Sequence, residues 1–321
     1  MTAPSGQRPS GRLGRVAFGA AAFAVFAPAG LATLPLAVLV LLSRPRTVAE
    51  VTAAAIAGGF SLWWLIQPGT IADQTARAAA VIGTAAFVLA TRFFHSSLTH
   101  RTLFAAAAAA VALGLMFLAG PWAWSDVRFW VEHRTGFAVR VVLGPFWMTQ
   151  SGSASASAGT LADLERWFDM SVRLLADQYA AVLALQLMAG LALAWTIYRR
   201  VAREPEGDAP GRFRDFRFTE HLGWLAVVAL TTVLIPRLAA AKLAAANLLL
   251  VTGVLYAVRG AAVATFGLAA AGGTGFGTIA LIALAVLFIL PAMAAGAIVL
   301  GVVDAGLDLR RRWSATVPRS R

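Results

Sequence analysis

Long apolar runs alternate with short arginine-rich gaps along most of this chain. The clearest runs occupy residues 48–66, 71–93, 102–120 and 179–198. About 20 apolar residues in helical form cross the roughly 30 Å hydrocarbon layer of a bilayer. A helix also satisfies its own backbone hydrogen bonds in lipid. The pattern therefore predicts an all-α fold, a polytopic transmembrane helical bundle of about eight to ten membrane segments.

The N-terminal part begins with a polar, basic tail at residues 1–15, and its membrane helices extend over residues 16–120. The run Val16–Ala29 resembles the apolar core of a signal peptide. Apolar sequence resumes at once through Leu42, however, and Pro28 interrupts the stretch. We favour an uncleaved first helix followed by a short or broken second segment, with a cleaved signal as the alternative.

The middle of the chain breaks the pattern of simple spans. Residues 121–160 combine mixed charge with several tryptophans and end in a Ser/Ala/Gly tract at residues 151–159. This composition predicts an interfacial or re-entrant segment followed by a flexible linker. Over residues 161–198 we expect one long helix, polar at first, that becomes a span by residue 179.

The basic gaps predict the orientation. Cytoplasmic loops of bacterial membrane proteins carry an excess of Lys and Arg. This rule places the N-terminus and the arginine-rich loop 199–217 on the cytoplasmic side of a bacterial inner membrane, and we expect the same for the basic tail 310–321.

The C-terminal membrane helices, residues 218–309, allow two counts. Three spans at 222–236, 242–268 and 278–303 make nine segments in all and place the tail outside. A break at Arg259-Gly260 makes ten and returns the tail to the cytoplasm. Both alternatives stay open at this point.

Composition supports a membrane location and excludes several functions. Hydrophobic residues make up 59% of the chain and charged residues 13%, about half the charge of a soluble domain. The net charge of +12 lies in the gaps between spans, and no nucleic-acid-binding motif accompanies it, so we expect no nucleic-acid partner. The chain has no cysteine, and its four histidines lack metal-ligand spacing. We therefore expect no metal and no cofactor, and the absence of nucleotide-loop or nucleophile motifs predicts a non-enzyme.

Most acids near the spans have a structural explanation. Thr47 with Glu50, Thr70 with Asp73, and Thr160-x-x-Asp163 match the capping box at a helix start. We expect these acids to cap helices rather than to bind a ligand.

Arg259 is the most informative charged residue within an apolar run, because a charge in a bilayer is costly. Tyr256 and Arg259 share one helix face, so together they could hold an anionic or hydroxylated ligand. The alternative that we favour is that Arg259 reaches the interface or pairs with an acid such as Asp304. For Asn247 we expect a hydrogen bond between helices, with a ligand role as the alternative.

Two further groups are candidates. Asp304 and Asp308, with Arg311 and Arg312 close by, predict an ion-paired helix end, with proton or cation handling as the alternative. An aromatic set beside Arg128 could line a ligand vestibule, although a belt at the membrane interface explains its tryptophans equally. That set consists of Trp122, Trp124, Trp130 and Trp147.

Several segments of the C-terminal third carry a family resemblance. They are the segment Phe213-Arg-Asp-Phe-Arg-Phe218, the run from Asn247 to Tyr256 and Arg259-Gly260, and the pattern Gly301-x-x-Asp304-x-x-x-Asp308-x-Arg310. Together they resemble the YybS-like family of predicted bacterial membrane proteins. The resemblance implies a helical arrangement similar to that of the S-components of energy-coupling-factor transporters and of the rod-shape membrane protein MreD, which is an analogy of fold.

Two functional hypotheses follow. In the first, the chain is an S-component-like, substrate-binding subunit for uptake of a small metabolite and works with separate energising proteins. Its ligand would lie in an outward cavity, capped by the link between the first two helices or by residues 121–150. In the second, it is a non-transporting, MreD-like scaffold whose loop 199–217 and tail 310–321 dock cytoplasmic or membrane partners. We prefer the first.

Overall fold

The structure, a computed structural model, describes residues 10–94, 96–121, 123–151, 158–209, 211, 213–218, 221–270 and 290–307. Within these ranges every regular element is a helix and no strand occurs. The predicted all-α, polytopic helical fold is confirmed.

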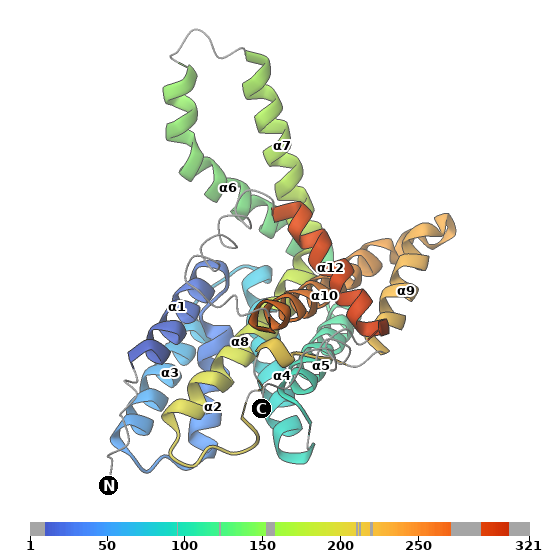
Figure 1. Ribbon diagram of the computed structural model, residues 1–321. Coiled ribbons are helices and arrows are strands. Elements are labelled where there is room, and N and C mark those ends of the chain that lie inside the picture. Colours follow the sequence, from blue (N-terminus) through green and yellow to red (C-terminus); the bar gives the residue numbers. More distant parts are fainter. Residues whose placement is uncertain are drawn as a thin grey trace. The chain divides into compact units, whose positions relative to one another are not determined.

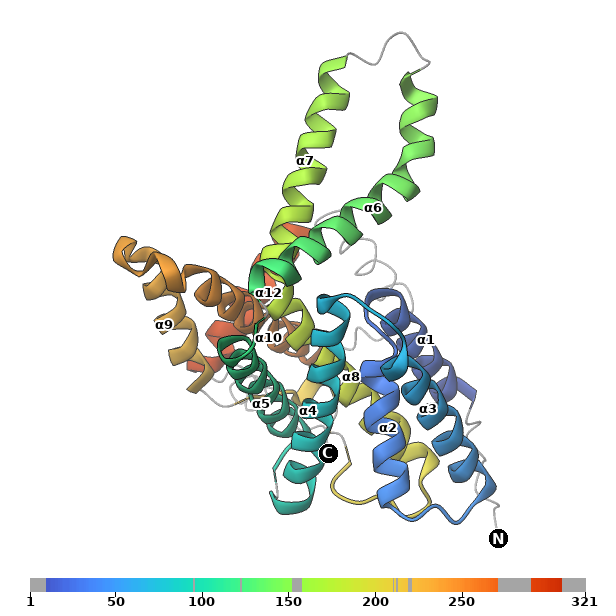
Figure 2. The same ribbon diagram turned by 180° about the vertical axis from the view of Figure 1, so that it is seen from behind.

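The chain divides into two compact units, Met1–Ala209 and Pro210–Arg321, which are called the N-terminal and C-terminal units below. The N-terminal unit contains α1 (Ser10–Phe26), α2 (Gly30–Leu42), α3 (Val48–Ile66), α4 (Ile71–Phe93), α5 (Leu98–Ala119), α6 (Trp124–Ser151), α7 (Ala158–Asp177) and α8 (Tyr179–Val201) (Figures 1 and 2). The C-terminal unit contains the short 3-10 helix η1 (Phe213–Asp215), α9 (His221–Leu234), the 3-10 helix η2 (Pro236–Ala241), α10 (Lys242–Ala270) and α12 (Leu290–Leu307).

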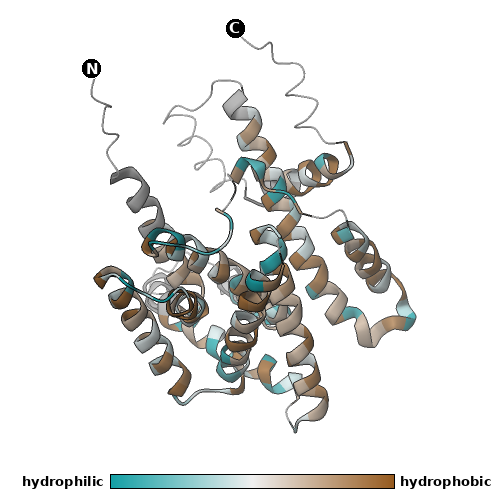
Figure 3. Cartoon of the chain, turned by 90° about the horizontal axis from the view of Figure 1, so that it is seen from below, coloured by the Kyte–Doolittle hydropathy of each residue, from teal (hydrophilic) through white to brown (hydrophobic). Residues whose placement is uncertain are grey.

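Five helices within the described ranges are long and apolar enough to cross a membrane. They are α3, α4, α5, α8 and the stretch Pro236–Gly267 formed by η2 and α10. Shorter apolar helices occur at Gly30–Leu42, His221–Leu234 and Gly296–Leu307. Figure 3 shows hydrophobic residues along the helices and hydrophilic ones mainly at their ends and links. The number of segments, nine or ten, stays a prediction.

Capping side chains fix where α3 and α4 begin. Thr47 accepts a hydrogen bond from the Glu50 N–H, and Glu50 accepts one from the Thr47 N–H. Thr70 and Asp73 do the same at the start of α4. Two of the three predicted capping boxes are therefore confirmed. At the third position the helix begins earlier than expected, because α7 starts at Ala158, ahead of Thr160.

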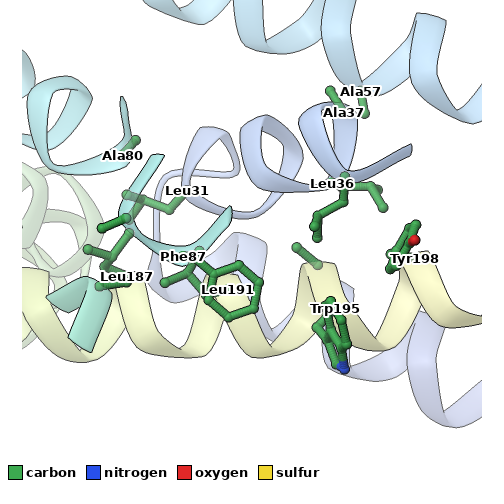
Figure 4. Close-up of a cluster of buried hydrophobic side chains, with 14 of the residues drawn as sticks. Leu31, Leu36, Ala37, Ala57, Ala80, Phe87, Leu187, Leu191, Trp195 and Tyr198 are labelled. Carbon is green, nitrogen blue, oxygen red and sulfur yellow. The ribbon is translucent and has the colours of Figure 1, made fainter. Parts of the chain in front are cut away.

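The core of the N-terminal unit forms around α8, which contacts α1 to α5 and α7. Leu187, Leu191, Trp195 and Tyr198 follow a helical period and are almost completely buried. Figure 4 shows these side chains facing residues of α2 and α4, and the Phe87 ring meets the Trp195 ring edge-on at 5.8 Å between centroids.

The region between α5 and α8 differs in detail from the expectation. Residues 124–151 and 158–177 form the helices α6 and α7, which pack on each other and extend as a hairpin (Figure 1). The long helix expected over residues 161–198 is instead two helices. Gln178 separates them, because its backbone (φ −93°, ψ 11°) departs from helical geometry. Residues 152–157 of the predicted linker lie outside the described residues.

The C-terminal unit shows that Arg259-Gly260 does not break a helix. α10 continues through both residues to Ala270, so the split that gave ten segments is wrong at this position. Gly260 serves close packing instead, because a Cβ there would collide with the Ala297 carbonyl of α12. Residues 271–289, between α10 and α12, lie outside the described ranges.

Two glycines of the N-terminal unit form a matched pair for a stability test. A Cβ at Gly190 would lie 2.6 Å from the Leu31 carbonyl oxygen of α2, whereas a Cβ at Gly114 would meet nothing within 4 Å. Gly190→Ala should therefore lower the thermal unfolding temperature in detergent. Gly114→Ala should leave it unchanged or raise it, since Ala is favoured over Gly in helices by about 1 kcal/mol. Equal effects of the two substitutions would contradict this packing of α8 on α2.

Candidate functional site

The C-terminal unit contains a buried ion pair between α10 and α12. Arg259 Nε donates to Asp304 Oδ2 at 2.9 Å, and Arg259 Nη2 donates to the Asp304 carbonyl oxygen at 3.2 Å. Arg259 is 4% exposed and Asp304 0%. A charge buried without a partner costs several kcal/mol, so each of these residues requires the other.

Glycines bring the two helices close enough for this pair. A Cβ at Gly260 would collide with the Ala297 carbonyl, and a Cβ at Gly301 would collide with the Tyr256 carbonyl. Small residues that let backbones approach are typical of helix contacts in membranes. Each charged residue therefore lies within one helical turn of the point where α10 and α12 approach closely. Arg259 directly precedes Gly260 on α10, and Asp304 follows Gly301 by three residues on α12.

Aromatic side chains cover the arginine. The guanidinium of Arg259 lies 5.3 Å from the centre of the Phe218 ring, a distance at which a cation is attracted to the ring face. Tyr256 meets the same ring edge-on at 5.1 Å between centroids. Tyr256 and Arg259 thus both contact Phe218, and Arg259 also pairs with Asp304. Pairing with Asp304 is the structural alternative expected for Arg259 from the sequence. Their ligand role stays a prediction.

Asn247, the other predicted residue of this unit that the structure describes, is not part of that group. Asn247 lies twelve residues before Arg259 on α10, about 18 Å along the helix axis, and its amide donates to the Leu243 carbonyl of its own helix at 2.9 Å. Asp308, Arg311 and Arg312 lie outside the described residues. Their predicted helix-end pairing stays a prediction, and within the described part Asp304 pairs with Arg259.

A second polar group lies in the N-terminal unit, where α3 ends and α4 begins. Asp73 Oδ2 accepts hydrogen bonds from the backbone and hydroxyl of Thr70, and Asp73 Oδ1 accepts one from Arg134 Nη1 at 2.7 Å. One carboxylate therefore caps α4 and also holds α6 against it.

Arg77 extends this group by one helical turn. Its Nη1 donates to the Gln67 carbonyl, and its guanidinium lies 5.9 Å from the centre of the Trp64 ring. Arg77 Nε and Gln178 Oε1 are both buried and have no hydrogen-bonding partner among the described residues. Such orphaned groups are rare in native proteins, and each one needs an explanation.

Aromatic residues border the same end of the unit. Tyr179 donates to the Ala72 carbonyl at 3.1 Å, and its ring lies 6.4 Å from that of Trp124. Arg128 forms an ion pair with Asp177 at 2.9 Å. The structure thus brings the predicted Trp124 and Arg128 to this end, while Trp122 and the side chain of Trp147 lie outside the described residues. We call Trp64, Asp73, Arg77, Trp124, Arg134 and Tyr179 the α4-start cluster.

Sequence reasoning did not assign a site role to Arg77, Arg134 or Tyr179. Arg77 carried a usable signal, because a charged residue inside an apolar run is a functional candidate. Its position four residues after Asp73 also fits an ordinary helical ion pair, which is a structural explanation. Arg134 and Tyr179 come from distant segments that only the fold of α6 and α8 brings to Asp73.

Comparison with known families now places the chain. The family DUF2232, described as predicted membrane proteins, matches residues 16–305. This chain belongs to the DUF2232 family. The match confirms membership of a membrane protein family and residence in a lipid bilayer, and its description gives no activity. No curated protein and no solved structure matches the chain.

The buried pair predicts a characteristic pattern of stability in this DUF2232 protein. Arg259→Met or Asp304→Leu alone should destabilise the fold by about 3–5 kcal/mol, because each leaves one charge buried without a partner. The double variant Arg259→Met/Asp304→Leu should recover most of that loss, as measured by unfolding of the full chain in detergent. Additive losses would show that the two side chains do not depend on each other.

Proposed function

We propose that this chain is a substrate-binding subunit of the membrane, similar to an S-component, that serves uptake of a small anionic metabolite and does no chemistry itself. Its ligand would bind at the α4-start cluster. The observation that carries the proposal is the buried Nε of Arg77, which has no hydrogen-bonding partner among the described residues. A ligand with an acid group would satisfy it.

The surroundings of Arg77 support an anionic ligand. Its guanidinium carries a fixed charge and a planar set of donors that suits carboxylates, and Trp64 offers an apolar face beside it. Aromatic walls with a few fixed polar groups are typical of small-molecule sites. Asp73 already accepts hydrogen bonds from Thr70 and Arg134. The positive charge of Arg77 is therefore available to an anionic ligand.

The arginine distribution supports an outward position for this end of the unit. The gap before α3 contains Arg44 and Arg46, and the loop after α8 contains Arg199, Arg200 and Arg203. With those gaps in the cytoplasm, the start of α4 faces outward. An outward site agrees with uptake. The last residue of α1 is attached to α8, because the Gln186 side chain donates to the Phe26 carbonyl at 2.6 Å.

The test is ligand retention by purified protein. Wild-type chain extracted in detergent should carry a small acidic metabolite detectable by mass spectrometry, and a metabolite panel should contain compounds that raise its unfolding temperature. Arg77→Gln should weaken that binding about tenfold or more, since bonds to a charged group contribute about 1.5–3 kcal/mol. The control Arg173→Gln, on the exposed face of α7, should bind as wild type. Absence of any bound or stabilising metabolite would contradict the proposal.

A second candidate function is an MreD-like scaffold, and the shape of the loop after α8 favours it. The Arg203 N–H donates to Glu50 Oε1 at 2.6 Å, and the Glu206 N–H donates to the Tyr198 hydroxyl at 2.9 Å. These bonds attach the loop at Arg203 and Glu206 to the start of α3 and the last turn of α8, as a docking surface requires. Partner proteins that copurify with wild type and are lost from Arg203→Glu would support this scaffold, and unchanged partners would remove its support.

A further inference from the structure

A cleft at the other end of the N-terminal unit carries a separate inference. It lies where α4 ends and α5 begins, and its volume is about 550 Å³. The residues that line it are Ala90, Phe94, Ser96, Ser97, His100, Arg101 and Phe104. None of these residues belongs to the α4-start cluster.

Arg101 is the unusual member of this lining. It is only 4% exposed, and its guanidinium lies 5.5 Å from the centre of the Trp195 ring. Its Nε has no hydrogen-bonding partner, and no carboxylate within the described ranges lies at ion-pair distance. A buried cation of this kind is costly unless an anion compensates it.

The start of α5 adds donors to the lining of the cleft. Ser97 caps the helix by accepting a hydrogen bond from the His100 N–H at 3.5 Å, and its hydroxyl lies 2.7 Å from His100 Nδ1. The first N–H groups of a helix and its dipole attract anions, and phosphate groups above all. The stretch 92–101 contains two arginines and two histidines and no acid.

Apolar side chains complete the lining of the cleft. Phe94 and Phe104 meet edge-on at 5.9 Å between ring centroids, and both are about half exposed. The cleft thus combines one buried cation and a helix start with an apolar face.

We propose that this cleft binds a phosphate-bearing anion, with the phosphate on Arg101, Ser97 and the first turn of α5, and any apolar part against Phe94 and Phe104. The phosphate comes from an anionic phospholipid headgroup or from a free phosphate compound. The proposal does not depend on the proposed function, because the two sites share no residue.

The experiment uses full-length protein and two probes. Inorganic phosphate is titrated calorimetrically onto protein in detergent at constant ionic strength. Separately, the protein is reconstituted in phosphatidylcholine vesicles with or without phosphatidylglycerol, extracted again, and its retained phospholipid is measured by mass spectrometry. Phosphate binding in the first arm identifies a free phosphate ligand, and selective retention of phosphatidylglycerol alone identifies a headgroup.

In whichever arm shows binding, Arg101→Gln should weaken it about tenfold or more. The control Arg46→Gln, an exposed arginine paired with Glu204 outside the cleft, should change binding less than twofold. Should Arg101→Gln fail to fold, Ser97→Ala decides, with a severalfold loss expected. Binding in neither arm, or equal losses in Arg101→Gln and Arg46→Gln, or full binding by Ser97→Ala, overturns the proposal.

Discussion

The cost of an uncompensated charge in hydrocarbon governs this structure. The bilayer offers no water to a buried guanidinium or carboxylate, so each must find its partners within the chain or in a ligand. Arg259 and Asp304 illustrate the closed case, since a 2.9 Å bond joins them and Phe218 covers the arginine. The pair and the glycines Gly260 and Gly301 lie together where α10 crosses α12.

The same constraint separates structural charges from functional ones in the N-terminal unit. The Glu50 carboxylate accepts hydrogen bonds from the backbone N–H groups of Arg46, Thr47 and Arg203. It therefore connects the loop after α8 to the start of α3. Arg77 and Arg101 are different, because neither forms an ion pair with a carboxylate among the described residues, and the Nε of each is buried without an acceptor there. Arg77 lies near the start of α4, and Arg101 lies at the start of α5, near the end of α4. The proposed metabolite site rests on Arg77, and the proposed phosphate site rests on Arg101.

Much of the fold followed from local sequence. Apolar length with a capping box located α3 and α4 to the residue, because both signals act within one helix. The break at Gln178 and the continuity of α10 through Gly260 were missed, since the first has no proline or glycine to mark it and the second depends on α12. The pairing of Arg259 with Asp304 was foreseen as one alternative, whereas Arg134 and Tyr179 beside Asp73 required contacts between segments more than 60 residues apart. The periodicity of hydrophobic residues within one helix gives no information on such long-range contacts.

The central claim is that the start of α4 faces outward and the loop after α8 faces the cytoplasm. The chain has no cysteine, so single cysteines can be introduced without background. Gln74 and Asp208 are exposed positions at these two places. In intact cells a membrane-impermeant thiol reagent should label Gln74→Cys at once and Asp208→Cys only after permeabilisation. The reverse pattern would invert the membrane orientation and contradict the outward ligand site.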